Sequence, residues 1–205
     1  MQALSSKDLS QIEYYHFTIG DFAGIEDVII SATGYTGAGG FELYFASEAA
    51  PKVWDAVMKA GEKYGIEPCG LASRDSLRLE KAYCLYGNDI DETRNTLEAG
   101  LGWVTKMDTD FIGKPALEKI KSEGLKHKLI AFEIDEKGIP RPGYPILSQA
   151  GQEIGQVTSG GMSPILGKGI GLGYVAFDQS QIGHRINIEI RGKQVPAKIV
   201  KAPFV

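Results

Sequence analysis

The first part of the chain alternates between apolar, β-prone runs and amphipathic stretches. Runs rich in aromatic and β-branched residues at 12–19, 27–32 and 41–46 predict three short strands. Between the last two lies the glycine-rich stretch 34–40, GYTGAGG. Several of its positions are expected to need a positive φ, which glycine adopts without a steric penalty. The pattern therefore predicts a tight hairpin turn between two strands.

Helical periodicity follows these strands. Apolar residues spaced i, i+3 and i+4 predict a helix over residues 47–64, with Ser47 as its N-terminal cap. A second helix is predicted over 73–82, with Leu77 as its clearest core contact, and a third over 114–122. Mixed strands and helices of this kind predict an α+β region.

No convincing helical pattern follows residue 124. Short β-prone runs recur instead, separated by turns, and this spacing is typical of a small β-barrel or a β-sandwich. The runs lie at residues 128–134, 153–158, 171–177, 185–190 and 194–200. We therefore predict two domains, an α+β part at 1–122 and an all-β part at 123–205.

Composition narrows the possible partners and locations. The net charge is −4, so there is no basic excess to attract a phosphate backbone, and nucleic acid is not an expected partner. No apolar run approaches the ~18 residues of a membrane span, and the N-terminus has no signal-peptide pattern. A cytoplasmic location, or the mitochondrial matrix in a eukaryote, is expected. Cys69 and Cys84 are expected to be reduced thiols.

Metal and phosphate sites are poorly supported. The three histidines, His16, His127 and His184, are far apart and lack the paired spacing of metal ligands. The glycine-rich turn has the spacing G-x-x-G-x-G-G and is followed by a predicted strand. A phosphate-binding loop needs a different spacing and a following helix. No metal site is predicted.

Glu42 is the first polar candidate. It lies between Phe41 and Leu43 in an otherwise apolar strand, directly after the glycine-rich turn. Side chains alternate along a strand, so Glu42 is predicted to point away from both neighbours. It is either a solvent-exposed carboxylate, or it faces a cleft and accepts two parallel N–H bonds from a flat heterocycle.

Two further segments carry candidate polar residues. Arg74, Arg78 and Glu80 lie on the second predicted helix and form either a salt-bridged surface or part of a site. The segment 84–91 places Tyr86, an amide and two acids around one glycine. Loops with this mixture of side chains are often functional.

Taken together and in this order, several stretches resemble the T protein family of the glycine cleavage system. The resemblance extends over essentially the whole chain. The matching stretches are TGYTG at 33–37, GFEL at 40–43, GLASRDSLRLE at 70–80, CLYGNDID at 84–91, EAGLGW at 98–103, VTSGGMS at 157–163, GLGYV at 171–175 and PFV at 203–205.

The resemblance implies a fold and an activity. Members of the family have an N-terminal folate-binding region, a ferredoxin-like α+β region and a C-terminal β-barrel. They are aminomethyltransferases, in which N5 of tetrahydrofolate attacks a methylene carbon held on the lipoyl arm of H protein. Ammonia leaves and 5,10-methylenetetrahydrofolate forms. Tetrahydrofolate as co-substrate and lipoylated H protein as partner are therefore implied.

The resemblance also implies roles for four residues. Glu42 matches the glutamate that hydrogen-bonds the pterin, and Arg74 matches an arginine that contacts the folate tail. Tyr35 and Tyr86 match tyrosines that flank the ring or its linker. The catalytic aspartate of the family lies upstream of any residue in this sequence. We therefore predict a C-terminal portion of the enzyme, with no catalytic residue of its own and no independent turnover.

Two alternatives stay open at this point. The first is another folate-dependent one-carbon enzyme, such as a dimethylglycine- or sarcosine-oxidising enzyme or a tRNA-modifying relative. The second is a non-catalytic folate-binding or structural module. The sequence also departs from the family pattern, with Ala38 and Gly39 where acidic residues are usual within the turn.

Overall fold

The computed structural model describes residues 1–205, which divide into two units, Met1–Arg74 and Asp75–Val205. Each unit has its own apolar core. The helix α2 (Leu71–Glu80) begins in the first unit and ends in the second. The domain boundary predicted after residue 122 stays a prediction.

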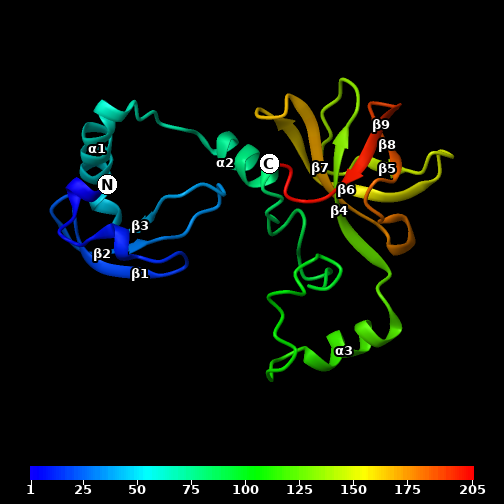
Figure 1. Cartoon of the computed structure of the whole chain (residues 1–205), viewed down its shortest axis with the longest axis horizontal. Coiled ribbons are helices and arrows are strands. Elements are labelled where there is room, and N and C mark those ends of the chain that lie inside the picture. Colours follow the sequence, from blue (N-terminus) through cyan, green and yellow to red (C-terminus); the bar gives the residue numbers. More distant parts are fainter. The chain divides into compact units, whose positions relative to one another are not determined.

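A three-stranded antiparallel sheet with the order β1-β2-β3 forms the centre of the first unit (Figure 1). The 3-10 turns η1 and η2 precede the sheet, and α1 follows it between the 3-10 turns η3 and η4. The bounds are η1 Gln2–Leu4, η2 Leu9–Gln11, β1 Phe17–Phe22, β2 Ile25–Ser31, β3 Glu42–Tyr44, η3 Ser47–Ala49, α1 Ala50–Gly61 and η4 Glu62–Tyr64. One face of the sheet packs with α1 around Leu9, Phe22, Val28, Ile30 and Val53.

Two of the three predicted strands are confirmed at nearly their predicted positions, and the first begins later than predicted. Residues 12–16 are not in a strand, and Tyr15 has a φ of 66° there, which breaks an extended run. The predicted hairpin is confirmed by the antiparallel pairing of β2 and β3, but the prediction of a tight turn is wrong, because residues 32–41 form a longer connection. Within it, Gly37 has a φ of 66° and Gly40 a φ of 154°, conformations that favour glycine.

The predicted helix at 47–64 is confirmed as a continuous run of η3, α1 and η4. Gly65, with a φ of 71°, ends this run in the left-handed conformation typical of a helix C-terminus. The predicted cap is wrong. The Ser47 hydroxyl lies 3.0 Å from the Glu48 carboxylate and donates to it instead of to a helix N-terminal backbone group.

The second unit contains α3 and a closed antiparallel β-barrel with the strand order β4-β7-β6-β5-β8-β9 (Figure 1). Of the two predicted architectures, barrel and sandwich, the barrel is correct. The bounds are α3 Lys114–Glu123, β4 His127–Ile134, β5 Pro145–Leu147, β6 Glu153–Ser163, β7 Lys168–Ala176, η5 Phe177–Gln179, β8 Arg185–Ile190 and β9 Lys193–Val200. Five strands and α3 follow the predictions, and β5 was missed because its three residues are too few for a periodic signal.

Side chains that alternate along the strands fill the barrel. The fully buried members include Phe132, Ile146, Val175 and Ile188, each 0% exposed. Glycine permits close strand approach at two positions. A Cβ on Gly171 would lie 2.4 Å from Phe132 Cζ, and one on Gly155 would lie 1.9 Å from the Tyr174 carbonyl oxygen. The barrel therefore depends on the absence of side chains at these positions.

The second predicted helix is confirmed as α2, but its predicted core contact is wrong. Leu77 is 36% exposed, whereas Leu79 is 2% exposed and packs against Ala131, Ile170 and Leu172 of the barrel. Arg78 and Glu80 are 1% and 2% exposed, so the interpretation of these residues as a salt-bridged surface is also wrong. The C-terminal turn of α2 is therefore a buried part of the second unit.

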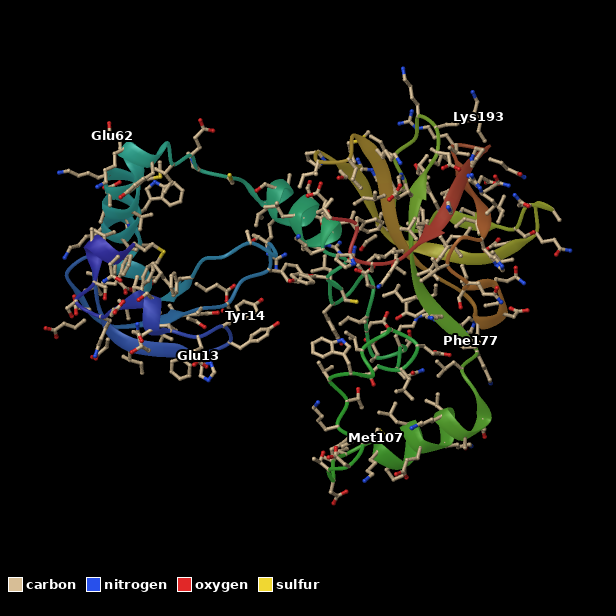
Figure 2. The ribbon with its side chains drawn as sticks, viewed as in Figure 1. Glu13, Tyr14, Glu62, Met107, Phe177 and Lys193 are labelled. Carbon is tan, nitrogen blue, oxygen red and sulfur yellow. The ribbon has the colours of Figure 1, made fainter.

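A turn-rich segment joins α2 to α3 and includes Met107, which is labelled in Figure 2. Glu98 fixes this segment to the start of β4. Its Oε1 accepts hydrogen bonds from the backbone N–H groups of Lys126 at 3.0 Å and His127 at 2.9 Å. None of the helices has both the length and the apolar character needed to span a bilayer.

Candidate functional site

Glu42 is the first residue of β3, immediately after the hairpin turn. Its neighbours Phe41 and Leu43 pack against the core of the first unit, while the Glu42 side chain is exposed. The prediction that Glu42 points away from both neighbours is confirmed. In this chain its carboxylate faces the open side of the sheet.

That open face is largely apolar. Strand register places Glu42 beside Ser31, which in turn pairs with Phe17. The next row on the same face is Ile19, Ile29 and Tyr44. Phe17, Ile19 and Tyr44 are 63%, 51% and 53% exposed. A contiguous set of exposed apolar side chains around one carboxylate is typical of a binding surface.

Two hydroxyl groups hold the Glu42 carboxylate. Thr33 Oγ1 donates to Glu42 Oε2 at 2.6 Å, and Tyr44 Oη donates to the same oxygen at 3.0 Å. Ser31 Oγ lies 3.1 Å from Thr33 Oγ1 and extends the chain of hydroxyls. Glu42 Oε1 accepts no hydrogen bond from the chain. The hydrogen bond with Glu42, together with its negative charge, raises the pKa of the Tyr44 phenol.

Arg74 and Tyr35 contact each other within the same unit. The guanidinium carbon of Arg74 lies 4.4 Å from the centre of the Tyr35 ring. This is a cation–π distance, so the Arg74 charge lies over the Tyr35 ring. Tyr35 is half-buried in the glycine-rich turn, while Arg74 is exposed in the first turn of α2. The structure thus brings together two of the four predicted site residues.

Tyr86 belongs to the second unit. Tyr86 as a whole is 70% exposed, and its backbone forms an isolated parallel bridge with Ile90.

Glu13 and Tyr14, labelled in Figure 2, are exposed residues of the first unit, in the segment before β1. Sequence reasoning gave neither of them a role.

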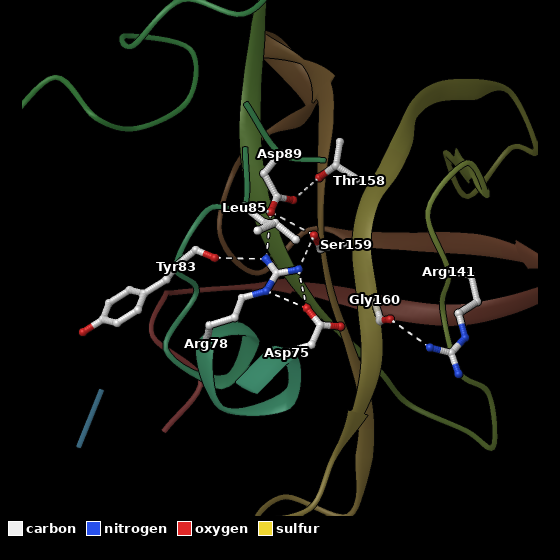
Figure 3. A network of polar contacts seen from close by, with 9 residues as sticks. All are labelled: Asp75, Arg78, Tyr83, Leu85, Asp89, Arg141, Thr158, Ser159 and Gly160. Atoms are coloured by element: carbon white, nitrogen blue, oxygen red, sulfur yellow. Dashed lines mark hydrogen bonds and ion pairs between the residues drawn. The ribbon is translucent and has the colours of Figure 1, made fainter. Parts of the chain in front are cut away.

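Within the segment 84–91, Asp89 has a structural role that was not predicted from the sequence. Asp89 is 0% exposed, and its Oδ2 lies 2.8 Å from Arg78 Nη1 (Figure 3). The same oxygen accepts from Leu85 N–H at 2.9 Å and from the Ser159 hydroxyl at 2.8 Å. A buried carboxylate with several donors is fully satisfied, so Asp89 holds the segment on the barrel.

Arg78 completes this network. Nε donates to Asp75 Oδ1 at 2.9 Å, Nη1 to the Tyr83 carbonyl oxygen at 3.0 Å and Nη2 to Ser159 Oγ at 2.8 Å (Figure 3). All three nitrogens are therefore bonded. The i, i+3 spacing of Asp75 and Arg78 was visible in the sequence, but the partners on the barrel strand β6 were not.

The two cysteines form no disulfide. Burial, and secondarily the negative charge of Asp89, raises the pKa of the Cys84 thiol to about 11. A thiol with a raised pKa is a poor nucleophile at neutral pH. Cys84 is therefore unsuited to nucleophilic catalysis in this chain.

An apolar pocket of about 490 Å³ lies against the outside of the barrel in the second unit. No charged residue lines it, so it offers an apolar surface without an anchor for an anionic group. Its lining includes Cys84, Ile90, Trp103, Leu129 and Leu172. No group of three or more His, Cys, Asp or Glu side chains is placed to hold a metal ion.

Two family models match the chain. The GCVT N-terminal domain matches residues 1–109, and the glycine cleavage T-protein C-terminal barrel domain matches residues 127–205. The second match coincides with the closed barrel β4–β9.

Similar proteins carry consistent names. The chain is 56% identical over 207 residues to an aminomethyltransferase of Porphyromonas gingivalis and 53% identical over 204 residues to one of Flavobacterium psychrophilum. Each alignment covers 100% of this chain and 57% of the relative, so the chain spans little more than half the length of these relatives.

One solved structure is also similar. It is the glycine cleavage system aminomethyltransferase T from Bartonella henselae, with a TM-score of 0.85 and 28% sequence identity. The alignment covers 97% of this chain and 54% of that one. Both units of this chain thus have counterparts in a longer protein.

Proposed function

Because the chain belongs to the glycine cleavage T-protein family, we propose that it is part of an aminomethyltransferase. The reaction transfers the methylene carbon from the aminomethyl-lipoyl arm of H protein to tetrahydrofolate and releases ammonia. The observation that supports this most directly is Glu42, an oriented carboxylate on an exposed apolar sheet face. The relatives are bacterial, which supports a cytoplasmic location.

Glu42 binds the pterin ring in this proposal. The pterin presents a ring N–H and an amino group side by side, and a carboxylate is the natural acceptor for such a pair. Each charge-assisted hydrogen bond of this kind contributes about 1.5–3 kcal/mol. The surrounding Phe17, Ile19 and Ile29 provide apolar surface beside a flat ring.

Arg74 and Tyr35 bind the remainder of the folate in this proposal. The cation–π contact with Tyr35 restrains the Arg74 guanidinium, whose N–H groups are proposed to bind the anionic or carbonyl-bearing tail. Tyr35 offers an aromatic surface to the ring or its linker. Tyr86 lies in the second unit with an exposed side chain, and its role in folate binding stays a prediction from the resemblance.

The reaction balances without an oxidant. N5 of tetrahydrofolate forms a bond to the methylene carbon, the bond from that carbon to the amino nitrogen breaks, and ammonia leaves. Ring closure by N10 then breaks the carbon–sulfur bond and frees the lipoyl thiol. The protons of N5 and N10 account for those taken up by sulfur and nitrogen.

The residues of this chain bind and orient the co-substrate. The resemblance assigns the catalytic aspartate to a part of the enzyme that this chain does not contain, so we propose no turnover by this chain alone. Positioning and electrostatic terms each contribute several kcal/mol to such a reaction. Lipoylated H protein is the proposed partner of the longer enzyme.

Ammonia release tests this proposal. The part of the Porphyromonas gingivalis relative that this chain does not match is joined to this chain, and the chimera is given aminomethyl-loaded H protein. Ammonia release that requires tetrahydrofolate is the expected result, with a loss of activity in Glu42→Gln. A folded chimera that releases no ammonia contradicts the aminomethyltransferase function and favours a related folate enzyme or a non-catalytic module.

A further inference from the structure

We propose that Thr33 and Tyr44 are positioning residues for Glu42, which fix its carboxylate so that Oε1 is presented to the pterin. This inference rests on the proposed function of Glu42. The contacts themselves do not, because they are formed within the first unit without a ligand.

The geometry of the two donors is the first support. Tyr44 lies two residues after Glu42 on β3, so both side chains lie on the same face of the sheet. Thr33 follows β2 and reaches the same carboxylate from across the hairpin. Two donors that converge on Glu42 Oε2 from different elements restrict rotation of the carboxylate plane.

The hydrogen-bond acceptor positions of the two Glu42 oxygens give the second argument for this role of Thr33 and Tyr44. An ionised carboxylate has about four lone-pair positions, two on each oxygen. Thr33 and Tyr44 both occupy Oε2. The open acceptor positions therefore lie on Oε1, so the two adjacent N–H groups of the pterin both donate to this one oxygen, one to each of its lone pairs.

Fixing the Glu42 side chain before the ligand binds reduces the entropy cost of binding. Glutamate has one of the larger rotamer entropies among the side chains, and an exposed glutamate loses that freedom when it binds a ligand. Hydroxyl donors that fix the rotamer beforehand reduce this cost on binding. Thr33 is itself supported by Ser31, and the raised pKa of Tyr44 keeps its phenol protonated as a donor.

Folate affinity is the first part of the test. Tetrahydrofolate is titrated calorimetrically into wild type, Thr33→Val and Tyr44→Phe, with Thr33→Ser as the conservative variant. Each loss of a hydroxyl is expected to weaken binding about fivefold, while Thr33→Ser stays within about twofold of wild type. Tyr64→Phe is the matched control, because Tyr64 is 77% exposed and lies outside this network. Wild-type affinity in both Thr33→Val and Tyr44→Phe overturns the inference.

The titration of Tyr44 is the second part and needs no folate. Nuclear magnetic resonance of chains with ring-labelled tyrosine follows the phenol, and Tyr44→Phe identifies its signal. Glu42→Gln is expected to lower the pKa of Tyr44, because it removes the hydrogen bond to a carboxylate and the negative charge, both of which oppose phenolate formation. Glu62→Gln, a change at an exposed acid of the same unit, is expected to leave it unaltered. An unchanged Tyr44 titration in Glu42→Gln overturns the contact.

The two parts separate this inference from the function on which it rests. Equal tetrahydrofolate affinity in wild type and Glu42→Gln, or no binding by either, contradicts the proposed role of Glu42. The Tyr44 titration then decides alone whether the hydroxyl contacts exist. A shifted titration with weakened binding in Thr33→Val and Tyr44→Phe supports the inference in full.

Discussion

Arg78 and Asp89 form an ion pair of 2.8 Å inside the second unit, with 1% and 0% of the two residues exposed. The arginine comes from α2 and the aspartate from the segment that follows it. Ser159 of β6 contacts both, so this pair joins two chain segments to the barrel. The segment 84–91, which has the composition of a functional loop, is therefore held in place by the buried carboxylate of Asp89.

Asp89→Asn is expected to destabilise the second unit by about 3–5 kcal/mol, since it removes the buried counter-charge of Arg78 and leaves only the exposed Asp75. Urea unfolding measures the change. Asp135→Asn is the control, because the Asp135–Arg185 pair is exposed and is expected to contribute no more than about 1 kcal/mol. Equal effects of the two variants would contradict a buried structural role for Asp89.

Glu80 provides a second buried anchor. Its Oε1 accepts from the Ser163 hydroxyl and, at 3.1 Å, from the Ile165 backbone N–H. Glu80→Ala leaves both donors without their acceptor and is expected to cost about 1–3 kcal/mol in urea unfolding. Glu136→Ala, at an exposed acid of the same unit, should change stability little. A Glu80→Ala variant as stable as Glu136→Ala would show that water replaces the lost acceptor.

Gly155 tests the close packing of β6 against β7. A Cβ there would lie 1.9 Å from the Tyr174 carbonyl oxygen, so the two strands must separate in Gly155→Ala. Loss of strand hydrogen bonds is expected to lower the melting temperature by several degrees, a shift that corresponds to about 1–2 kcal/mol. Gly102→Ala is the control, because its Cβ would meet only Leu97 Cδ2, at 3.5 Å. An unchanged melting temperature in Gly155→Ala would contradict this packing.

The raised pKa of Cys84 predicts how stability and thiol reactivity change with pH. Its folded-state pKa of about 11 lies above that of an unfolded thiol, so the folded chain holds the proton more tightly. The resulting stabilisation is complete below the unfolded pKa and is lost as pH rises through about 11. Alkylation of Cys84 in a Cys69→Ser chain is therefore expected to be slow at pH 8 and to accelerate toward pH 11. Rapid alkylation at pH 8, at the rate of the urea-unfolded chain, would contradict the raised pKa.

Local patterns predicted the elements that depend on nearby residues. The hairpin turn needs glycine at positions of positive φ, and the GYTGAGG stretch supplies it. The face of Glu42 follows from strand alternation, and the structure confirms it. Helix α3 and five barrel strands lie close to their predicted ranges for the same reason.

Contacts between distant residues were not predictable in this way. Arg78 bonds to Ser159 and Glu80 to Ser163, across 81 and 83 positions of the sequence. A charged residue on a short helix resembles a surface residue unless these partners are known, which explains the wrong interpretation of α2. The Thr33 donor to Glu42 was missed for a related reason, because Thr33 lies nine positions away across a turn.

Recognition of the pterin of tetrahydrofolate is proposed to depend on Glu42. Calorimetric titration of tetrahydrofolate into wild type, Glu42→Gln and the control Glu62→Gln tests it most directly, because only the first substitution removes a carboxylate from the apolar sheet face. Equal affinity is expected for wild type and Glu62→Gln, with a loss of about tenfold or more in Glu42→Gln. Equal affinities in all three proteins would contradict it.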